Sequence, residues 1–147
     1  MPTIRNLPLI ALALACAAPA LADPAPGAAD DAAISALIDP SLAALRSGKS
    51  RQAVDLFLGT NPLMASKTSD IAVLASQIDA AIGAYGPIGA CQLTETVNNG
   101  PWVQQRLYHC QHTNLVTRWI YQTVRTSKGW MPSNLSFDDK VTKRLEE

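Results

Sequence analysis

The fold is decided by residues 88–137, which contain four β-rich runs separated by turn residues. The runs are 88–97 (IGACQLTETV), 102–111 (WVQQRLYHCQ), 115–126 (LVTRWIYQTVRT) and 130–137 (WMPSNLSF). They are rich in β-branched and aromatic residues, and the segments between them contain Asn, Gly, Pro and Ser. This stretch predicts four consecutive antiparallel strands. Pro132 has no N–H to donate, which predicts that the last strand lies at a sheet edge or beside a bulge.

The third run has two different sides. Val116, Ile120 and Val124 alternate with Trp119 and Tyr121. Since neighbouring residues of a strand point to opposite faces, one side can pack on helices. We expect the aromatic side to be half exposed, to line a pocket or to meet another subunit.

A first helix is predicted from an apolar stripe with spacings of three and four residues. Asp30 or Asp31 can cap its beginning, and Gly48 ends it. Asp39-Pro40 falls inside the stripe, so the helix is expected either to kink or to restart with Asp39 as its cap.

Two further helices are expected before the sheet. Ser50 can cap a short helix over 51–58, and Ser69 or Asp70 can cap a longer one over 71–84. The segment between them begins with Asn61-Pro62 and is expected to form a loop or a single turn.

The N-terminal residues predict export. Arg5 precedes a short apolar run, and Ala20-Leu21-Ala22 is typical of a signal-peptide cleavage site, so 1–22 is predicted to be a signal peptide. The apolar run is too short to span a membrane, which takes about 20 residues. A lipoprotein anchored through Cys16 is the alternative. Both routes lead to a periplasmic or secreted protein, in which 23–29 is a flexible linker and 30–147 a single domain.

Charge is spread unevenly along a chain whose formal net charge is zero. The predicted sheet carries Arg106, Arg118, Arg125 and Lys128 against Glu95 alone. This excess can favour an anionic partner, or it can be an ordinary solvated strand face. No basic cluster has the density that nucleic-acid binding requires, so nucleic acid is not expected as a partner.

Cys91 and Cys110 remain after the expected signal peptide and fall on neighbouring strands of one hairpin. If Val97 pairs with Trp102, the two cysteines are diagonal to each other. If the turn is Asn99 to Trp102, they face each other directly. Both registers place the sulfurs on one face, and export favours oxidation, so a cross-strand disulfide is predicted, with two buried thiols as the alternative.

The order of the elements is similar to that of small exported proteins of the NTF2-like (cystatin-like α+β) superfamily. The segments that carry the likeness are 43–57 (AALRSGKSRQAVDLF), 80–87 (AAIGAYGP) and 126–137 (TSKGWMPSNLSF). The resemblance implies an α+β fold, in which N-terminal helices, two short and one long, pack on a curved four-stranded antiparallel sheet to form a cone. It also implies homodimers through the sheet, and either a binding module or an isomerase, cyclase or hydrolase.

An enzyme of that kind needs a buried acid or base and a hydrogen-bond donor in the cone. Glu95, His109 and Tyr121 are the candidates, and no nucleophile, phosphate-binding or metal motif accompanies them. We therefore expect no catalytic residue, no metal and no cofactor. Cys91, Cys110 and His112 share a face but lack the clustered spacing of a zinc site.

Large aromatic side chains and one histidine are the candidates for a pocket or an interface. They are Trp102, Tyr108, His109, Trp119, Tyr121 and Trp130. The sequence thus favours an exported binding domain for a small apolar ligand or a protein partner, acting through the sheet or cone. An enzyme or a structural, envelope-associated dimer is the alternative.

Overall fold

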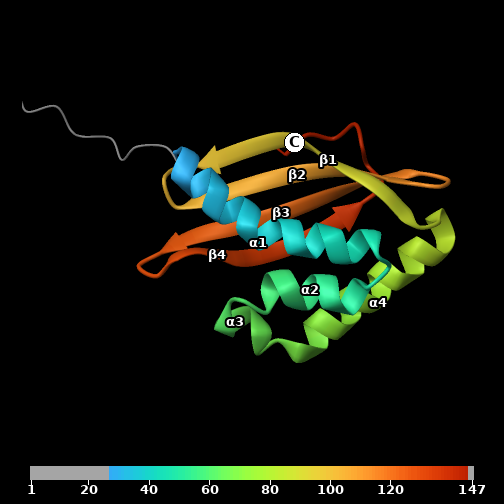
Figure 1. The fold of residues 1–147 in the computed structure, drawn as a ribbon, viewed down its shortest axis with the longest axis horizontal. Helices are drawn as coiled ribbons and strands as arrows, with labels where there is room; N and C mark the ends of the chain where they lie inside the picture. Colours follow the sequence, from blue (N-terminus) through green and yellow to red (C-terminus); the bar gives the residue numbers. More distant parts are fainter. Residues whose placement is uncertain (1–26, 146–147) are drawn as a thin grey trace, which may run out of the picture.

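In the computed structural model, which describes residues 27–145, four helices precede a four-stranded sheet. The helices are α1 (Ala28–Arg46), α2 (Ser50–Leu58), α3 (Pro62–Ala65) and α4 (Thr68–Tyr85). The strands are β1 (Ile88–Asn99), β2 (Val103–His112), β3 (Val116–Thr126) and β4 (Gly129–Asp138), in the spatial order β1-β2-β3-β4. Helices α1 and α2 lie over one face of the curved sheet, and α4 extends beyond its β4 side (Figure 1). The predicted α+β fold is confirmed.

Helix α1 begins earlier than the sequence suggested and continues through Pro40 without a break. It starts at Ala28, and the Asp30 carboxylate accepts a hydrogen bond from the Gly27 N–H instead of capping the helix itself. The helix does not restart at Pro40. Pro40 has no N–H to donate to the carbonyl of Ala36, four residues earlier in the helix. Both residues are on the exposed side of the helix, so this carbonyl is open to solvent. The expected signal peptide and most of the expected linker lie outside the described residues.

The other helix starts differ from the expected caps. Ser50 lies inside α2, where its buried hydroxyl has no hydrogen-bond partner among the described residues. Helix α4 begins at Thr68, without a side-chain cap, so Asp70 lies in its first turn. Asn61 does cap α3, because its side-chain oxygen accepts from the Leu63 N–H at 3.1 Å.

The register between β1 and β2 combines a direct cysteine pair with a bulge. Cys91 pairs with Cys110 and Leu93 with Tyr108, as the second expected register required. A bulge at Thr94 then shifts the pairing by one residue, so that Asn99 pairs with Val103. The register in which Val97 pairs with Trp102 is wrong.

The aromatic side of β3 is the packed side, contrary to expectation. Trp119 and Tyr121 are fully buried, and the ring of Phe57 from α2 packs edge-on against Tyr121 at 4.9 Å. Ile120 and Val124 on the other face remain partly exposed. The large rings turn toward the helices because only that face has a deep enough core to cover them.

Strand β4 confirms the interpretation of Pro132 in both respects. It is the last strand of the sheet, and its pairing with β3 shifts immediately after Pro132, so Ser133 is the extra residue of a bulge. The side-chain amide of Asn61 donates to the Pro132 carbonyl at 2.7 Å, which covers the edge at this point.

The turn from α4 into the sheet gives a testable prediction about two glycines. Gly86 has a φ of +89°, and a Cβ there would lie 2.7 Å from the Thr113 side chain, whereas a Cβ at helical Gly83 would meet nothing within 4 Å. We expect Gly86→Ala to lower the free energy of unfolding by about 1–3 kcal/mol. Gly83→Ala, the matched control, should leave it unchanged or raise it by up to about 1 kcal/mol. Urea unfolding of both variants measures this, and equal effects would contradict it.

Candidate functional site

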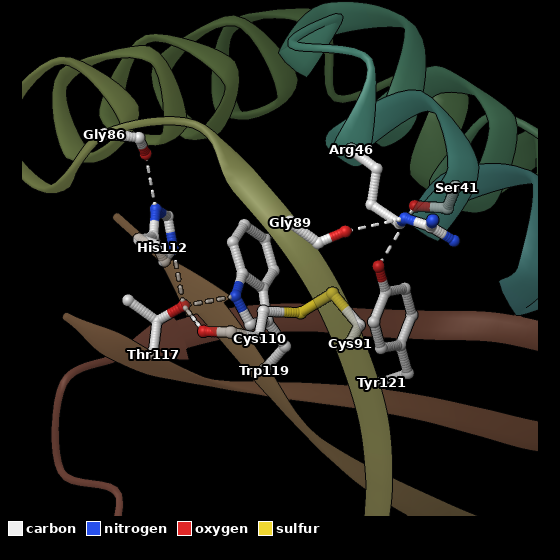
Figure 2. Close-up of a disulfide and its surroundings, with 10 residues drawn as sticks. All are labelled: Ser41, Arg46, Gly86, Gly89, Cys91, Cys110, His112, Thr117, Trp119 and Tyr121. Carbon is white, nitrogen blue, oxygen red and sulfur yellow. Dashed lines mark hydrogen bonds between the residues drawn. A yellow bond between two sulfur atoms is a disulfide. The ribbon is translucent and has the colours of Figure 1, made fainter. Parts of the chain in front are cut away.

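A disulfide joins Cys91 of β1 to Cys110 of β2, as predicted from the sequence. The two residues are directly paired, with their Cα atoms 4.0 Å apart. Cys110 is fully buried and Cys91 partly so, on the face that the helices cover. Figure 2 shows the sulfurs lying between Trp119 and Tyr121. The bond therefore links β1 to β2, with Cys110 in the core and Cys91 packed against it.

A chain of buried hydrogen bonds runs beside the disulfide (Figure 2). The Gly86 carbonyl accepts from His112 Nδ1 at 2.7 Å, which places the proton of a neutral ring on that nitrogen. His112 Nε2 then accepts from the Thr117 hydroxyl at 2.9 Å, and Trp119 Nε1 donates to the same oxygen at 2.7 Å. The network ties the end of α4 to β2 and β3.

Tyr121 is held inside the same core. Its hydroxyl and that of Ser41 in α1 share a hydrogen bond of 3.2 Å, and burial raises the pKa of Tyr121 well above its ordinary value. Burial also raises the pKa of Tyr108, whose ring packs edge-on against Tyr121 at 5.7 Å. Both phenols are therefore neutral at physiological pH, and Tyr121 joins α1 to the sheet.

The aromatic residues and the histidine proposed for one pocket or interface occupy three places. Tyr108, Trp119, Tyr121 and Trp130 are buried on the helix-covered face. Trp130 Nε1 donates to the Asp30 carboxylate of α1 at 2.8 Å, and this bond lowers the pKa of Asp30. Trp102 is 58% exposed beside the β1–β2 turn, and His109 lies on the opposite face of the sheet. An interface role for Trp102 or His109 stays a prediction.

Glu95 and His109 lie on the outer face, whereas Tyr121 lies on the inner one. The Glu95 carboxylate accepts from the Arg144 guanidinium at 3.2 Å and from the Leu145 N–H at 3.2 Å. These contacts hold the C-terminal segment 139–145 on the outer face of the sheet. His109 Nε2 lies under this segment in a hollow of about 180 Å³, without a hydrogen-bond partner among the described residues.

Two strand arginines are buried, which corrects the interpretation of these positions as a solvated face. Arg106 is 4% exposed; its guanidinium donates to Asp31, Ser35 and Gln104 and ties α1 to β2. Arg118 on the outer face is 6% exposed. The alternation of residues along a strand shows which face of the sheet each arginine is on. It does not show which residues cover the arginine there.

Arg118 fastens the C-terminal segment. Its Nε and Nη2 donate to the two carboxylate oxygens of Asp138 at 3.0 and 2.6 Å, and these bonds lower the pKa of Asp138. Its Nη1 donates to the Lys143 carbonyl at 2.7 Å. A bidentate pair of this kind fixes the orientation of the guanidinium. The remaining nitrogen, Nη1, is then free to bind the C-terminal segment.

The candidate binding site is a cleft of about 250 Å³ between the helices and edge strand β4. Five apolar side chains from α2, α3, α4 and β4 line it, together with four polar residues. The apolar ones are Leu58, Met64, Ile71, Leu74 and Leu135, and the polar ones are Lys67, Asp70, Ser133 and Asn134. The sequence pattern missed this cleft, because its residues come from elements that are distant in the chain.

Among residues 27–145, no helix is long and apolar enough to cross a membrane. No group of His, Cys, Asp and Glu within this range could hold a metal ion.

Comparison with known proteins supports the fold. No protein-family model matches the sequence, and neither does any curated protein. The structure is similar to the crystal structure of a domain of unknown function with a cystatin-like fold from Nostoc punctiforme, with a TM-score of 0.51 over 82% of each chain. Because the two sequences are 11% identical, this likeness shows the cystatin-like α+β fold alone.

The disulfide yields a prediction about the purified protein. We expect its intact mass to be lower by two hydrogens than that of the reduced chain, with no alkylation of Cys91 or Cys110 before reduction. Replacing both cysteines with serine should lower the free energy of unfolding by about 2–4 kcal/mol, because the unfolded chain loses its constraint. Full alkylation of both thiols in non-reduced protein would contradict the bond.

The buried network yields a second prediction. Thr117→Val keeps the shape of the side chain but leaves Trp119 Nε1 and His112 Nε2 without partners. We expect the free energy of unfolding to fall by about 1–3 kcal/mol, the cost of unsatisfied buried polar groups. Thr117→Ser keeps the hydroxyl and is the control. Equal losses in both variants would show that the methyl group, and not the hydrogen bonds, is responsible.

Proposed function

We propose that this protein is an exported, non-catalytic binding domain that holds a small apolar molecule in the cleft between α3, α4 and β4. The observation that carries the proposal is the lining of this cleft: five apolar side chains converge there, with charged and amide groups beside them. Ligand sites typically have apolar walls and a few polar groups that orient the ligand.

The geometry of α4 supports this choice of site. Ile71, Ala75 and Ile78 are buried, but Leu74 is only partly so and faces the cleft. Helix α4 packs mainly on α2, and the cleft lies between the first half of α4 and β4. Lys67, which immediately precedes the helix, and Asp70 in its first turn line the same cleft. A ligand with one polar end and an apolar body therefore fits its chemistry.

The separation of the acid–base candidates favours binding over catalysis. Glu95 and His109 are on the outer face, and the Tyr121 hydroxyl is bonded to Ser41 on the inner face. A single substrate cannot contact both faces at once, so these residues do not form one proton-transfer site. An isomerase or hydrolase therefore has less support from the geometry than a carrier does.

Export is supported by the disulfide, which fits an oxidising compartment. Cytosolic thiols are kept reduced, whereas exported proteins retain such bonds. We include the predicted signal peptide 1–22, and with it a periplasmic or secreted location, in the proposal.

A dimeric module is the second candidate, and one observation favours it. Val103, Val124 and Met131 form a row across the outer face and are only partly buried. A second copy packed on this row would cover apolar surface, as protein interfaces do. Analytical ultracentrifugation decides: a dimer that Val124→Lys dissociates supports this candidate, and a monomer at high concentration contradicts it.

The cleft itself is tested by filling it. The probe is N-phenyl-1-naphthylamine, an apolar dye that brightens when it leaves water, and native mass spectrometry of protein from its own host would detect a retained ligand. Leu74→Trp fills the cleft and should weaken dye binding by about tenfold or more. Val73→Trp adds the same ring on the 57% exposed neighbouring position and is the control. Equal binding to both variants would place the dye elsewhere and contradict the proposal.

A further inference from the structure

The two halves of edge strand β4 differ in how they are protected against pairing with a strand of another chain. Its first half contains Pro132, the bulge at Ser133 and the Asn61 side chain on the Pro132 carbonyl. Proline, bulges and covering groups are the devices by which proteins block pairing at a sheet edge. The second half, Leu135–Asp138, pairs regularly with β3 and, within the described residues, carries none of these devices.

A second hollow lies beside this unprotected half. It measures about 360 Å³ and separates β4 from the second half of α4. Small side chains of α4 form one wall, so the helix leaves space along the strand. The lining residues are Gln77, Ala80, Ala81, Ala84, Tyr85, Phe137, Asp138 and Asp139.

The end of this hollow is acidic. Asp138 is bound by Arg118, whereas the exposed carboxylate of Asp139 has no hydrogen bond or ion pair within residues 27–145. A cation arriving along β4 would therefore meet an exposed carboxylate that no side chain of residues 27–145 binds.

We infer that the second half of β4 binds an extended segment of another protein, which adds a strand to the sheet. An unpaired strand edge offers alternating backbone donors and acceptors, and only another extended chain satisfies them in register. One aliphatic side chain of the segment enters the hollow between Ala84 and Phe137, and a lysine or arginine lies against Asp139. This inference goes beyond the apolar-ligand cleft, because it has a different occupant and a different lining.

The probe is a blocked hexapeptide of alternating lysine and valine, titrated into the oxidised, isotope-labelled protein. We expect saturable shifts of the backbone amides over Leu135–Asp139 and Gln77–Tyr85, with a dissociation constant at or below about 1 mM. The same peptide with N-methyl groups on alternate residues keeps the side chains but loses its backbone donors. It should bind at least about tenfold more weakly, and equal binding of the two peptides would overturn strand addition.

Paired variants distinguish the contributions of the hollow and of the Asp139 charge to peptide binding from general effects of a substitution on helix α4. Ala84→Leu fills the hollow and should weaken binding about tenfold, whereas Ala72→Leu, at an exposed position of α4 outside the hollow, should not change it. Asp139→Asn should weaken binding of the basic peptide about threefold and reduce its salt dependence, and Asp79→Asn is the control.

Three outcomes would overturn the inference. One is the absence of any shift with the peptide at several millimolar. Another is a set of shifts confined to the cleft lined by Leu74 and Leu135, which would belong to the proposed apolar-ligand site instead. The third is movement of the β4 amides with protein concentration alone, which would make a second copy of this chain the occupant. Since the dye test uses Leu74→Trp and this test uses Ala84→Leu, failure of one leaves the other intact.

Discussion

The disulfide between Cys91 and Cys110 holds β1 and β2 in a single register, and the two faces of the sheet depend on that register. If the pairing at the cysteines continued unchanged along β1, Glu95 would lie opposite Arg106 under the helices. The bulge at Thr94 prevents this and places Glu95 on the outer face, opposite Leu107. One inserted residue therefore decides that the only acidic side chain of strands β1–β3 contacts the C-terminal segment and not the core.

Polar groups buried on the inner face determine how the helices sit on that sheet. Arg106 binds the first turns of α1, Tyr121 binds Ser41 further along the same helix, and His112 binds the residue that ends α4. Apolar packing alone would tolerate small shifts of a helix, because it is not directional. Hydrogen bonds at separate points along the layer do not tolerate them, since a displaced partner leaves a buried group unsatisfied. The network thus selects one arrangement of helices over the sheet.

The sequence predicted the parts of this structure that depend on local periodicity and turn residues. The strand order, the disulfide and the edge position of Pro132 follow from spacing within one continuous stretch. Alternation separates Trp119 from Ile120 but gives no measure of which side has the deeper core. From the sequence alone we therefore expect the aromatic side to be half exposed, to line a pocket or to meet another subunit, and not to be the packed side. The cleft could not be predicted, because its walls come from α2, α3, α4 and β4, and no local pattern records how these elements meet.

Both hollows beside β4 have a common physical origin in α4. Its buried residues Ile71, Ala75 and Ile78 belong to the same core as α2, and its C-terminal end is anchored by the Gly86–His112 bond and by the edge-on contact of Tyr85 with His112. Two hollows separate the helix from β4. A helix packed directly against β4 would protect this sheet edge from pairing with another chain, as the Asn61 side chain protects the Pro132 carbonyl. The open side between α4 and β4 therefore leaves two hollows along the strand, one beside each half of the helix.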